Sequence, residues 1–304
     1  MNVQNPSASR GIVIQAVDLV KNYGTGSNMV HALRGVNVSF ERGKFTAIMG
    51  PSGSGKSTLM HTLAGLDSAT SGHILFGGAD LTRMDDKQLT LLRRHKIGFI
   101  FQSFNLLPMF TAEQNILMPL TLAGDKPDRA WFDLLVETLG LKQRLNHRPN
   151  ELSGGQQQRV AIARALITKP KLVFADEPTG NLDSVSSAEV LSFLKRSVNE
   201  LGQTIVMVTH DAVAASYADR AIVFADGQIV ADEANPTAET MNDLLMAERE
   251  RATRAAVTST RADTLARLAG VKDVPNLPIT DAPLPPAGRT GTMHHARAAA
   301  QHAR

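Results

Sequence analysis

The residues best suited to chemistry lie in one run, Gly50-Pro51-Ser52-Gly53-Ser54-Gly55-Lys56-Ser57. It fits the pattern G-x-x-x-x-G-K-[ST] of the phosphate-binding P-loop. Glycines let successive backbone N–H groups point at a phosphate, and the N-terminus of a following helix adds positive potential. We expect Lys56 to reach the β- and γ-phosphates and the Ser57 hydroxyl to bind Mg²⁺. The alternative, a glycine-rich turn with a chance lysine, is disfavoured because every fixed position of the pattern is filled.

The flanking segments are of the kind that can position this loop. Phe45–Met49 is a short apolar run and is expected to be a buried strand. Residues 57–63 are expected to form a helix, so Thr58 joins the residues predicted to bind the nucleotide. A strand, a glycine loop and a helix start, in that order, predict a site for a nucleoside triphosphate.

Two carboxylates follow a second apolar run. Residues 171–175 are predicted to be a strand, and Asp176 and Glu177 come at its C-terminal end, where ligands bind in open α/β sheets. We expect Asp176 to hold Mg²⁺ together with Ser57. Glu177 could orient or deprotonate a water molecule that attacks the γ-phosphate. Alone, these acids would be interpreted as solvated turn residues, but a P-loop in the same chain favours the catalytic interpretation.

A second glycine motif, Leu152-Ser153-Gly154-Gly155-Gln156, precedes a predicted helix over residues 157–167. Ser153 and Gln156 match a capping box. The glycines and the helix N-terminus form a second anion site, without a lysine. One nucleotide does not need two such sites from one chain. We therefore expect a two-fold dimer in which each chain's second site closes over the other chain's nucleotide. The alternative is a capped helix with a glycine-rich lead-in.

Over about residues 12–245, these motifs resemble the ATP-binding subunits of ABC transporters. The P-loop matches the family's Walker A motif, residues 152–156 match the signature motif, and residues 172–177 match the Walker B motif. The resemblance implies an ATP hydrolase that uses ATP and Mg²⁺, with two active composite sites per homodimer. It also implies an integral membrane permease as partner, and a peripheral location on the cytoplasmic face of the cell membrane.

The resemblance also implies roles for residues outside the main motifs. Gln102 falls at the Q-loop glutamine, which contacts Mg²⁺ or water and links to the permease. Asn181-Leu182-Asp183 matches the D-loop, and His210 matches the switch histidine that contacts the γ-phosphate. Tyr23 is similar to the aromatic residue that stacks on adenine, although its glycine neighbours leave the ring position open. The implied catalytic residues are Glu177, His210, Gln102 and Lys56, the metal ligands are Ser57, Gln102 and Asp176, and Asp183 joins the nucleotide-binding set.

Three segments resemble one branch of this family: Ile97-Gly98-Phe99-Ile100-Phe101-Gln102-Ser103-Phe104-Asn105-Leu106-Leu107-Pro108, Asn115-Ile116-Leu117-Met118-Pro119-Leu120, and Asp176-Glu177-Pro178-Thr179-Gly180-Asn181-Leu182-Asp183. The branch contains lipoprotein-releasing, macrolide-exporting and antimicrobial-peptide-resistance ATPases and a cell-division pair. Their permeases often transmit ATP-driven motion across the membrane. An export or mechanotransmission role is therefore expected, and a regulatory ATPase that signals to an envelope enzyme without moving cargo stays open.

A soluble ATPase that shares the signature motif is a less favoured class. Chromosome-maintenance and break-repair relatives place a very long coiled coil between the P-loop and the signature. Fewer than a hundred residues separate Lys56 from Ser153 here, and they contain no sustained heptads. Translation-factor relatives carry two such domains in one chain, whereas this chain carries one.

The remaining pattern predicts an α/β fold, and the resemblance implies that it is of the ABC ATPase type. We expect a P-loop NTPase core with an antiparallel β subdomain, including strands over residues 11–17 and 30–40 joined by a turn-rich link at 21–26. Between Ser103 and Pro149 the pattern is helical, which predicts an inserted helical subdomain over about residues 103–165. Its first two helices are expected at residues 111–122 and 128–139, and Asp226-Gly227 predicts a hairpin.

Charge and composition separate the body of the chain from its tail. The 304 residues carry a net charge of +3, but the tail, residues 246–304, has nine Lys and Arg against five Asp and Glu, which leaves −1 for residues 1–245. The folded body therefore gives no electrostatic case for a nucleic-acid partner. The chain has no cysteine, which excludes disulfides and thiolate metal sites.

The segment divisions follow from the same composition. Residues 1–10 are polar, lack a signal-peptide core and are expected to be disordered, which predicts residence in the cytoplasm. Residues 11–245 are expected to be the ATP-binding domain, and 246–304 an Ala/Arg/Pro-rich extension that is helical to about residue 268 and then disordered. Residues 248–267 could lie against anionic lipid or the permease. A solvated extension is favoured because large apolar anchors are lacking.

Overall fold

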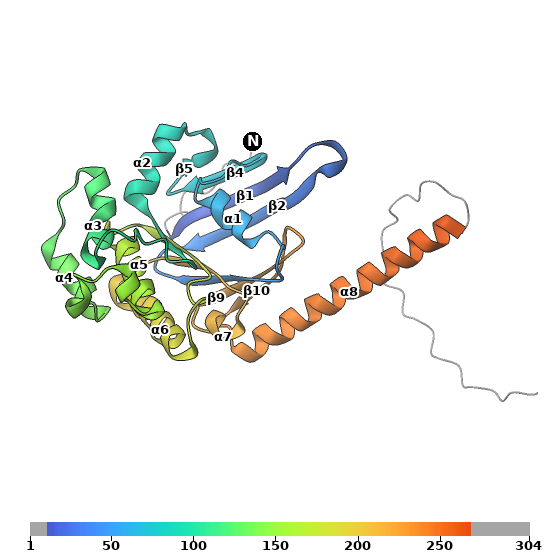
Figure 1. Cartoon of the computed structure of the whole chain (residues 1–304). Helices are drawn as coiled ribbons and strands as arrows, with labels where there is room; N and C mark the ends of the chain where they lie inside the picture. Colours follow the sequence, from blue (N-terminus) through green and yellow to red (C-terminus); the bar gives the residue numbers. More distant parts are fainter. Residues whose placement is uncertain (1–10, 269–304) are drawn as a thin grey trace, which may run out of the picture. The chain divides into compact units, whose positions relative to one another are not determined.

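The structure, a computed structural model, describes residues 11–268 (Figure 1). The disorder expected for residues 1–10 and beyond residue 268 lies outside the described residues. The chain divides into two compact units, Met1–Thr253 and Arg254–Arg304. All described strands lie in the first unit, which also contains every candidate site residue.

A mixed six-stranded sheet forms the centre of the first unit, in the order β10-β9-β3-β8-β7-β6. The pairs from β9 to β6 are parallel, and β10 joins β9 as an antiparallel hairpin. The predicted hairpin turn is present, with Asp226 and Gly227 both at positive φ as a type I′ turn requires. The strands of this sheet are β3 (Phe45–Met49), β6 (Ile97–Phe101), β7 (Leu172–Asp176), β8 (Ile205–Val208), β9 (Arg220–Ala225) and β10 (Gln228–Ala234).

This sheet is buried on both faces, so its inner strands are mostly apolar, with exceptions such as Thr46 and Asp176. In β7, Val173 and Ala175 pack into a core shared with several helices, whereas Leu172 and Phe174 pack into a second core on the other face. The alternation follows from the two-residue period of a strand. Two covered faces explain why these segments are continuous apolar runs instead of alternating ones.

The antiparallel sheet has the order β2-β1-β4-β5. Its strands are β1 (Ile12–Tyr23), β2 (Val30–Glu41), β4 (Ser71–Phe76) and β5 (Ala79–Asp80). The link predicted at residues 21–26 was wrong for its first half. Lys21 and Tyr23 continue β1 because they pair with Leu33 and Val30 of β2. Backbone pairing with a partner strand overrides the local turn signal, and only residues 24–26 leave the strand.

The helices of the chain are α1 (Lys56–Leu63), α2 (Asp86–Lys96), α3 (Ala112–Ala123), α4 (Arg129–Thr138), α5 (Gly154–Leu166), α6 (Ser184–Leu201), α7 (Ala212–Ala215) and α8 (Ala238–Leu268). Helices α3, α4 and α5 lie together in the green part of Figure 1. Thr111, Asp128 and Ser153 cap them, each side chain accepting a hydrogen bond from a backbone N–H of the first turn. Helix α5 begins three residues earlier than predicted, so the glycines of residues 154–155 form its first turn.

The segment between β6 and α3 is fixed from two sides. Arg164 of α5 is buried and donates hydrogen bonds of 2.6 Å to the carbonyl oxygens of Phe104 and Asn105. Both of these residues have positive φ, an uncommon conformation for non-glycine residues. Asn115 of α3 is fully buried; its side chain accepts from the Leu107 N–H and donates to three carbonyl oxygens of the segment. The loop that follows Gln102 is therefore held to both helices.

Helix α8 starts within the core of the first unit. Met241 is fully buried there, and Leu244 and Leu245 pack against the same core. The domain boundary predicted at residue 245 falls inside this helix. Among the described residues, no helix is long and apolar enough to cross a membrane.

Candidate functional site

The P-loop leaves β3 and enters α1, as the sequence predicts. Gly50 and Gly55 have positive φ and approach neighbouring backbone closely. An added Cβ would lie 1.9 Å from the Phe224 carbonyl oxygen at Gly50, and 2.4 Å from the Ala32 carbonyl oxygen at Gly55. These two glycines thus fix the loop against β9 and β2. Gly53 also has positive φ, which favours glycine, but an added Cβ there would meet no atom within 4 Å.

Lys56 lies across the loop that it follows. Its Nζ donates a 2.7 Å hydrogen bond to the Pro51 carbonyl oxygen, and only 8% of the residue is exposed. Burial lowers the pKa of Lys56, and the nearby carboxylates of Glu177 and Asp176 oppose that change. A desolvated cation at the N-terminus of a helix attracts a phosphate strongly.

A pocket of 620 Å³ opens beside the loop. Residues 53–58 line one part of it, and Tyr23, Met29 and Val30 provide an apolar part. The Ser54 hydroxyl is buried and has no hydrogen-bond partner among the described residues. An unpaired buried hydroxyl costs free energy that a bound phosphate oxygen would recover. The pocket therefore combines an anion cradle with an apolar wall, which fits a nucleotide.

Asp176 and Ser57 lie together at the end of β7 and the start of α1, with 3.5 Å between the Ser57 Oγ and the Asp176 Oδ1. Burial raises the pKa of Asp176, although His61, Ser57 and Lys56 oppose this. No cluster of three His, Cys, Asp or Glu occurs within residues 11–268. Mg²⁺ is usually held by one or two carboxylates together with phosphates and water. One hydroxyl and one desolvated carboxylate beside a phosphate cradle fit that ion.

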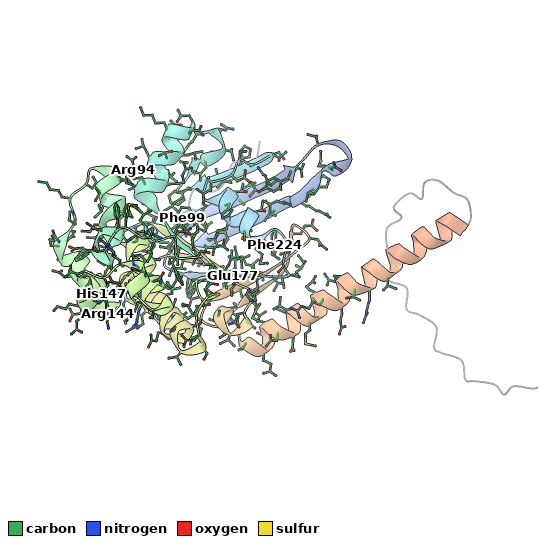
Figure 2. All side chains as sticks on the ribbon, in the orientation of Figure 1. Arg94, Phe99, Arg144, His147, Glu177 and Phe224 are labelled. Atoms are coloured by element: carbon green, nitrogen blue, oxygen red, sulfur yellow. The ribbon has the colours of Figure 1, made fainter. Side chains whose placement is uncertain are left out.

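Glu177 and His210 form a pair beside this position. His210 Nδ1 lies 2.9 Å from Glu177 Oε1, and Glu177 is labelled in Figure 2. Glu177 has φ of 46°, and its backbone N–H donates to the Val208 carbonyl oxygen. Strained backbone of this kind is concentrated at functional sites. The turn directs Glu177 away from the β7 direction and holds its carboxylate against the histidine, where a base for a water molecule is needed.

Gln102 follows β6 and is bound to the D-loop, a contact that the sequence did not indicate. Asn181 Nδ2 donates to the Gln102 carbonyl oxygen at 3.0 Å, and Gln102 Nε2 lies 3.4 Å from Asn181 Oδ1. Gly180 leaves room for the glutamine, since an added Cβ would lie 2.7 Å from its Nε2. Gln102 is thus linked to residues that follow Glu177 in the chain.

The second glycine motif packs on the D-loop and not on the P-loop pocket. An added Cβ at Gly154 would lie 3.6 Å from the Leu182 side chain, and one at Gly155 would lie 2.9 Å from the Ser186 Oγ. Asp183 caps α6, and hydrogen bonds from Ser186 and Val185 lower its pKa. None of residues 153–156 lines the P-loop pocket. The structure brings Lys56, Ser57, Asp176 and Glu177 together, and it leaves the signature residues with a separate neighbourhood.

Sequence reasoning missed the residues that hold Tyr23. The Tyr23 hydroxyl donates to Asp67, and Lys21 lies under the ring. The ring is therefore fixed, contrary to the expectation that its position was open. The available signal was the Lys21-x-Tyr23 spacing, which places both side chains on one face of a strand. It was hidden because this segment was interpreted as a turn.

Comparisons with known proteins agree with these features. The family profile described as ABC transporter matches residues 33–180. The lipoprotein-releasing system ATP-binding protein LolD of Geobacter metallireducens is 49% identical over 222 residues, 72% of this chain and 99% of that protein. The macrolide export ATP-binding/permease protein MacB of Syntrophobacter fumaroxidans is 49% identical over 221 residues, 71% of this chain and 31% of that protein.

A solved structure provides the third comparison. It is the dimeric post-hydrolysis state of the ATP-binding cassette MJ0796 bound to ADP and Pi, with a TM-score of 0.67 and 40% identity. The alignment covers 73% of this chain and 98% of that chain. The predicted fold class and the family resemblance are confirmed.

The raised pKa of Asp176 generates a prediction about stability without nucleotide. In the folded protein the carboxyl group takes up a proton at higher pH than in the unfolded chain, so its charge destabilises the fold above the folded pKa. This penalty is absent below the unfolded value of 3.8. Asp176→Asn should therefore raise the melting temperature of the nucleotide-free protein at pH 7, and the gain should shrink as the pH approaches 4. Thermal melts at both pH values measure this. Asp86→Asn, on the exposed surface, is the control, and a lower melting temperature for Asp176→Asn at pH 7 would contradict the interpretation.

Proposed function

The chain belongs to the ABC transporter family and is an ATP hydrolase, and on that premise we propose that two copies close around two MgATP and drive a membrane permease of the export or mechanotransmission type. One observation carries this proposal. The P-loop pocket is lined by residues 53–58 but by none of the signature residues, which pack on the D-loop. A second copy can supply the missing anion site. The dimeric cassette bound to ADP and Pi supports this arrangement.

The binding step uses the charges and donors of the P-loop. Lys56 and the N–H groups of residues 53–57 bind the phosphates. The Ser54 hydroxyl, which has no partner among the described residues, donates a hydrogen bond to a phosphate oxygen. Ser57 and Asp176 are positioned to hold Mg²⁺, which when bound neutralises charge that develops on the phosphates. Ser153 to Gln156 of the second copy add N–H donors from the N-terminus of its α5.

The hydrolytic step uses Glu177. Its carboxylate takes a proton from a water molecule whose oxygen attacks the γ-phosphorus, while the bond to the β,γ-bridging oxygen breaks and ADP leaves. His210, 2.9 Å from the Glu177 carboxylate, positions that base and can donate a hydrogen bond to the γ-phosphate. Gln102 is linked to the D-loop through its contact with Asn181, and Asp183 lies two residues further along that loop.

Coupling to the membrane partner uses the loop after Gln102. Arg164 and Asn115 hold this loop rigidly, and between their contacts it exposes Leu107 and Met109, the latter 72% exposed. Large apolar side chains on a fixed loop are suited to bind the cytoplasmic part of a permease. Because Arg164 and Asn115 hold this loop, a movement of Gln102 would be transmitted to the bound permease and would not be absorbed by a flexible loop. Such docking would hold the protein at the cytoplasmic face of the membrane, which is the location that we propose.

The first prediction of this proposal concerns Glu177. Glu177→Gln keeps the shape of the site but removes the base, so the hydrolysis rate should fall by about 10²- to 10⁴-fold while ATP still binds. Because the bound ATP is not consumed, the variant should elute from gel filtration as a dimer with ATP and as a monomer with ADP. Rapid hydrolysis by this variant would remove Glu177 from the role of base. Lys56→Ala in the same background is the control, and it should not dimerise.

The second prediction concerns the exposed loop. Met109→Glu places a charge where we propose an apolar contact, and loss of one buried apolar side chain costs about 1.5–3 kcal/mol. Recovery of the permease from detergent-solubilised membranes with tagged protein should fall about tenfold or more. The melting temperature should not change, because the side chain is 72% exposed. Leu201→Glu, at an exposed position on α6, is the matched control. An equal loss of permease recovery with both variants would contradict the docking assignment.

A further inference from the structure

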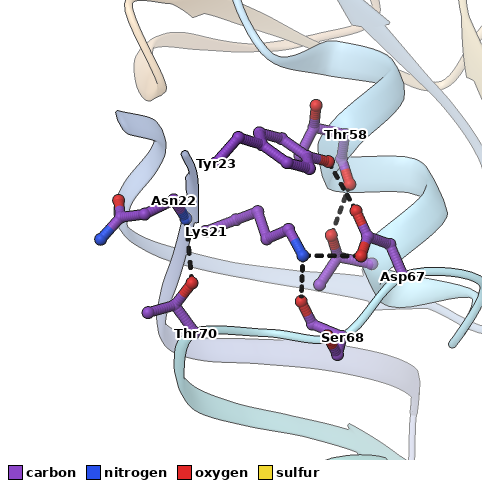
Figure 3. A network of polar contacts seen from close by, with 8 residues as sticks. Lys21, Asn22, Tyr23, Thr58, Asp67, Ser68 and Thr70 are labelled. Carbon is purple, nitrogen blue, oxygen red and sulfur yellow. Dashed lines mark hydrogen bonds and ion pairs between the residues drawn. The ribbon is translucent and has the colours of Figure 1, made fainter. Parts of the chain in front are cut away.

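A polar network holds the end of β1 beside the nucleotide pocket (Figure 3). Lys21 is only 7% exposed, and its Nζ donates to Asp67 Oδ1 at 2.6 Å and to the Ser68 carbonyl oxygen at 2.7 Å. The Tyr23 hydroxyl donates to the other carboxylate oxygen of Asp67 at 2.5 Å. Asp67 lies in the connection that follows α1, so it ties the last residues of β1 to the helix that begins at the P-loop.

The network fixes which side of the Tyr23 ring a ligand can reach. Lys21 and Tyr23 lie on the same face of β1, and the Lys21 Nζ lies 4.8 Å from the centroid of the ring (Figure 3). One face of the ring is therefore covered by an ammonium group that is already bound elsewhere. The residue is still 42% exposed and lines the pocket together with residues 53–58. Only its second face remains for a planar ligand.

The contacts in the network favour the protonation states on which its hydrogen bonds depend. Burial raises the pKa of Tyr23, and the hydrogen bond to Asp67 raises it further, which favours the protonated phenol that donates to Asp67. Burial alone would raise the pKa of Asp67, but hydrogen bonds from Lys21 and Tyr23 outweigh it and lower the pKa. A side-chain hydrogen bond with Thr58 also ties Tyr23 to α1.

We propose that Lys21 and Asp67 are positioning residues that hold the Tyr23 ring as a one-sided platform for the purine base of ATP. This inference rests on the ATP site proposed above and deepens it. Stacking on an aromatic ring contributes about 1–3 kcal/mol per base and is tolerant of the base, since every base has a π-face. A platform fixed before binding loses little entropy when the base arrives. Lys21 and Asp67 therefore act on nucleotide affinity and not on the chemical step.

The chain contains a matched control for this network. Lys169 Nζ lies 5.4 Å from the centroid of the Trp131 ring and 2.8 Å from Asp128 Oδ2. This is the same combination of lysine, aromatic ring and carboxylate, but none of the three residues lines the nucleotide pocket. A variant at Lys169 loses similar contacts outside the site.

The experiment measures steady-state hydrolysis of ATP and its inhibition by inorganic triphosphate, which has phosphates but no base. For Lys21→Met and Asp67→Asn we expect the KM for ATP to rise about 3- to 10-fold, as expected for loss of part of a stacking interaction, with little change in kcat. The inhibition constant of triphosphate should stay at the wild-type value. Lys21→Arg, which keeps the cation and its donors, should restore most of the affinity. Lys169→Met should change none of these constants.

Coupling to the ring supplies the decisive comparison. Tyr23→Ala should raise the KM for ATP at least as much as Lys21→Met, and adding Lys21→Met to Tyr23→Ala should cause no further rise. Tyr23→Phe keeps the ring and the Lys21–Asp67 pair, so it should cause a smaller rise than Tyr23→Ala. Tyr23→Phe therefore tests the proposal through the KM for ATP even if the changes at Lys21 and Asp67 prevent folding.

Three results would overturn the proposal. The first is an unchanged KM for ATP in folded Lys21→Met and Asp67→Asn. The second is a weakening of triphosphate inhibition in these variants that equals the rise in the KM for ATP. The third is that Lys21→Met raises the KM for ATP as much in the Tyr23→Ala background as in the wild type. Failure of the underlying ATP site has a different signature. It would appear as wild-type triphosphate inhibition in Lys56→Ala, whatever the variants at Lys21 and Asp67 do.

Discussion

The structure depends on one constraint: a phosphate needs N–H donors and positive potential around it. One chain presents such groups at two helix N-termini, and these two N-termini are separated from each other. Helix α1 begins at Lys56, inside the pocket, whereas α5 begins at Gly154, against the D-loop. The sheet fixes the first position because the P-loop glycines pack directly on β9 and β2. In the dimer that we propose, a second copy supplies the other helix start, so nucleotide binding and dimerisation would be one event.

The energetics of the free chain point to the same ligand. Lys56 and Asp176 both lose solvation, and the Ser54 hydroxyl is buried without a partner among the described residues, so the protein's own groups compensate this site poorly. The positive φ of Glu177 adds backbone strain beside them. By contrast, the buried side chains of Asn115 and Arg164 are paired with the loop after Gln102. Stability is thus given up at the pocket and retained in the loop that follows Gln102.

The sequence was sufficient wherever a local pattern decided the structure. The strand before the P-loop, the helix starts at Thr111 and Asp128, and the turn at Asp226 and Gly227 were all predicted because each depends on neighbouring residues. It failed where distant segments decide. Tyr23 was assigned to a link because its pairing with Val30 and its contact with Asp67 are tertiary. The contact between Gln102 and Asn181 likewise joins the ends of two strands that only the folded sheet brings together.

The most direct test of the account asks whose signature motif closes over whose nucleotide. The chain has no cysteine, so single labels can be introduced cleanly. In the Glu177→Gln background, copies carrying a donor dye at Asn150→Cys, just before the signature, are mixed with copies carrying an acceptor at His31→Cys, in the nucleotide pocket; both positions are exposed. The account predicts energy transfer between copies that appears with ATP and not with ADP. Transfer that is independent of nucleotide, or an ATP-dependent rise confined to doubly labelled single copies, would contradict it.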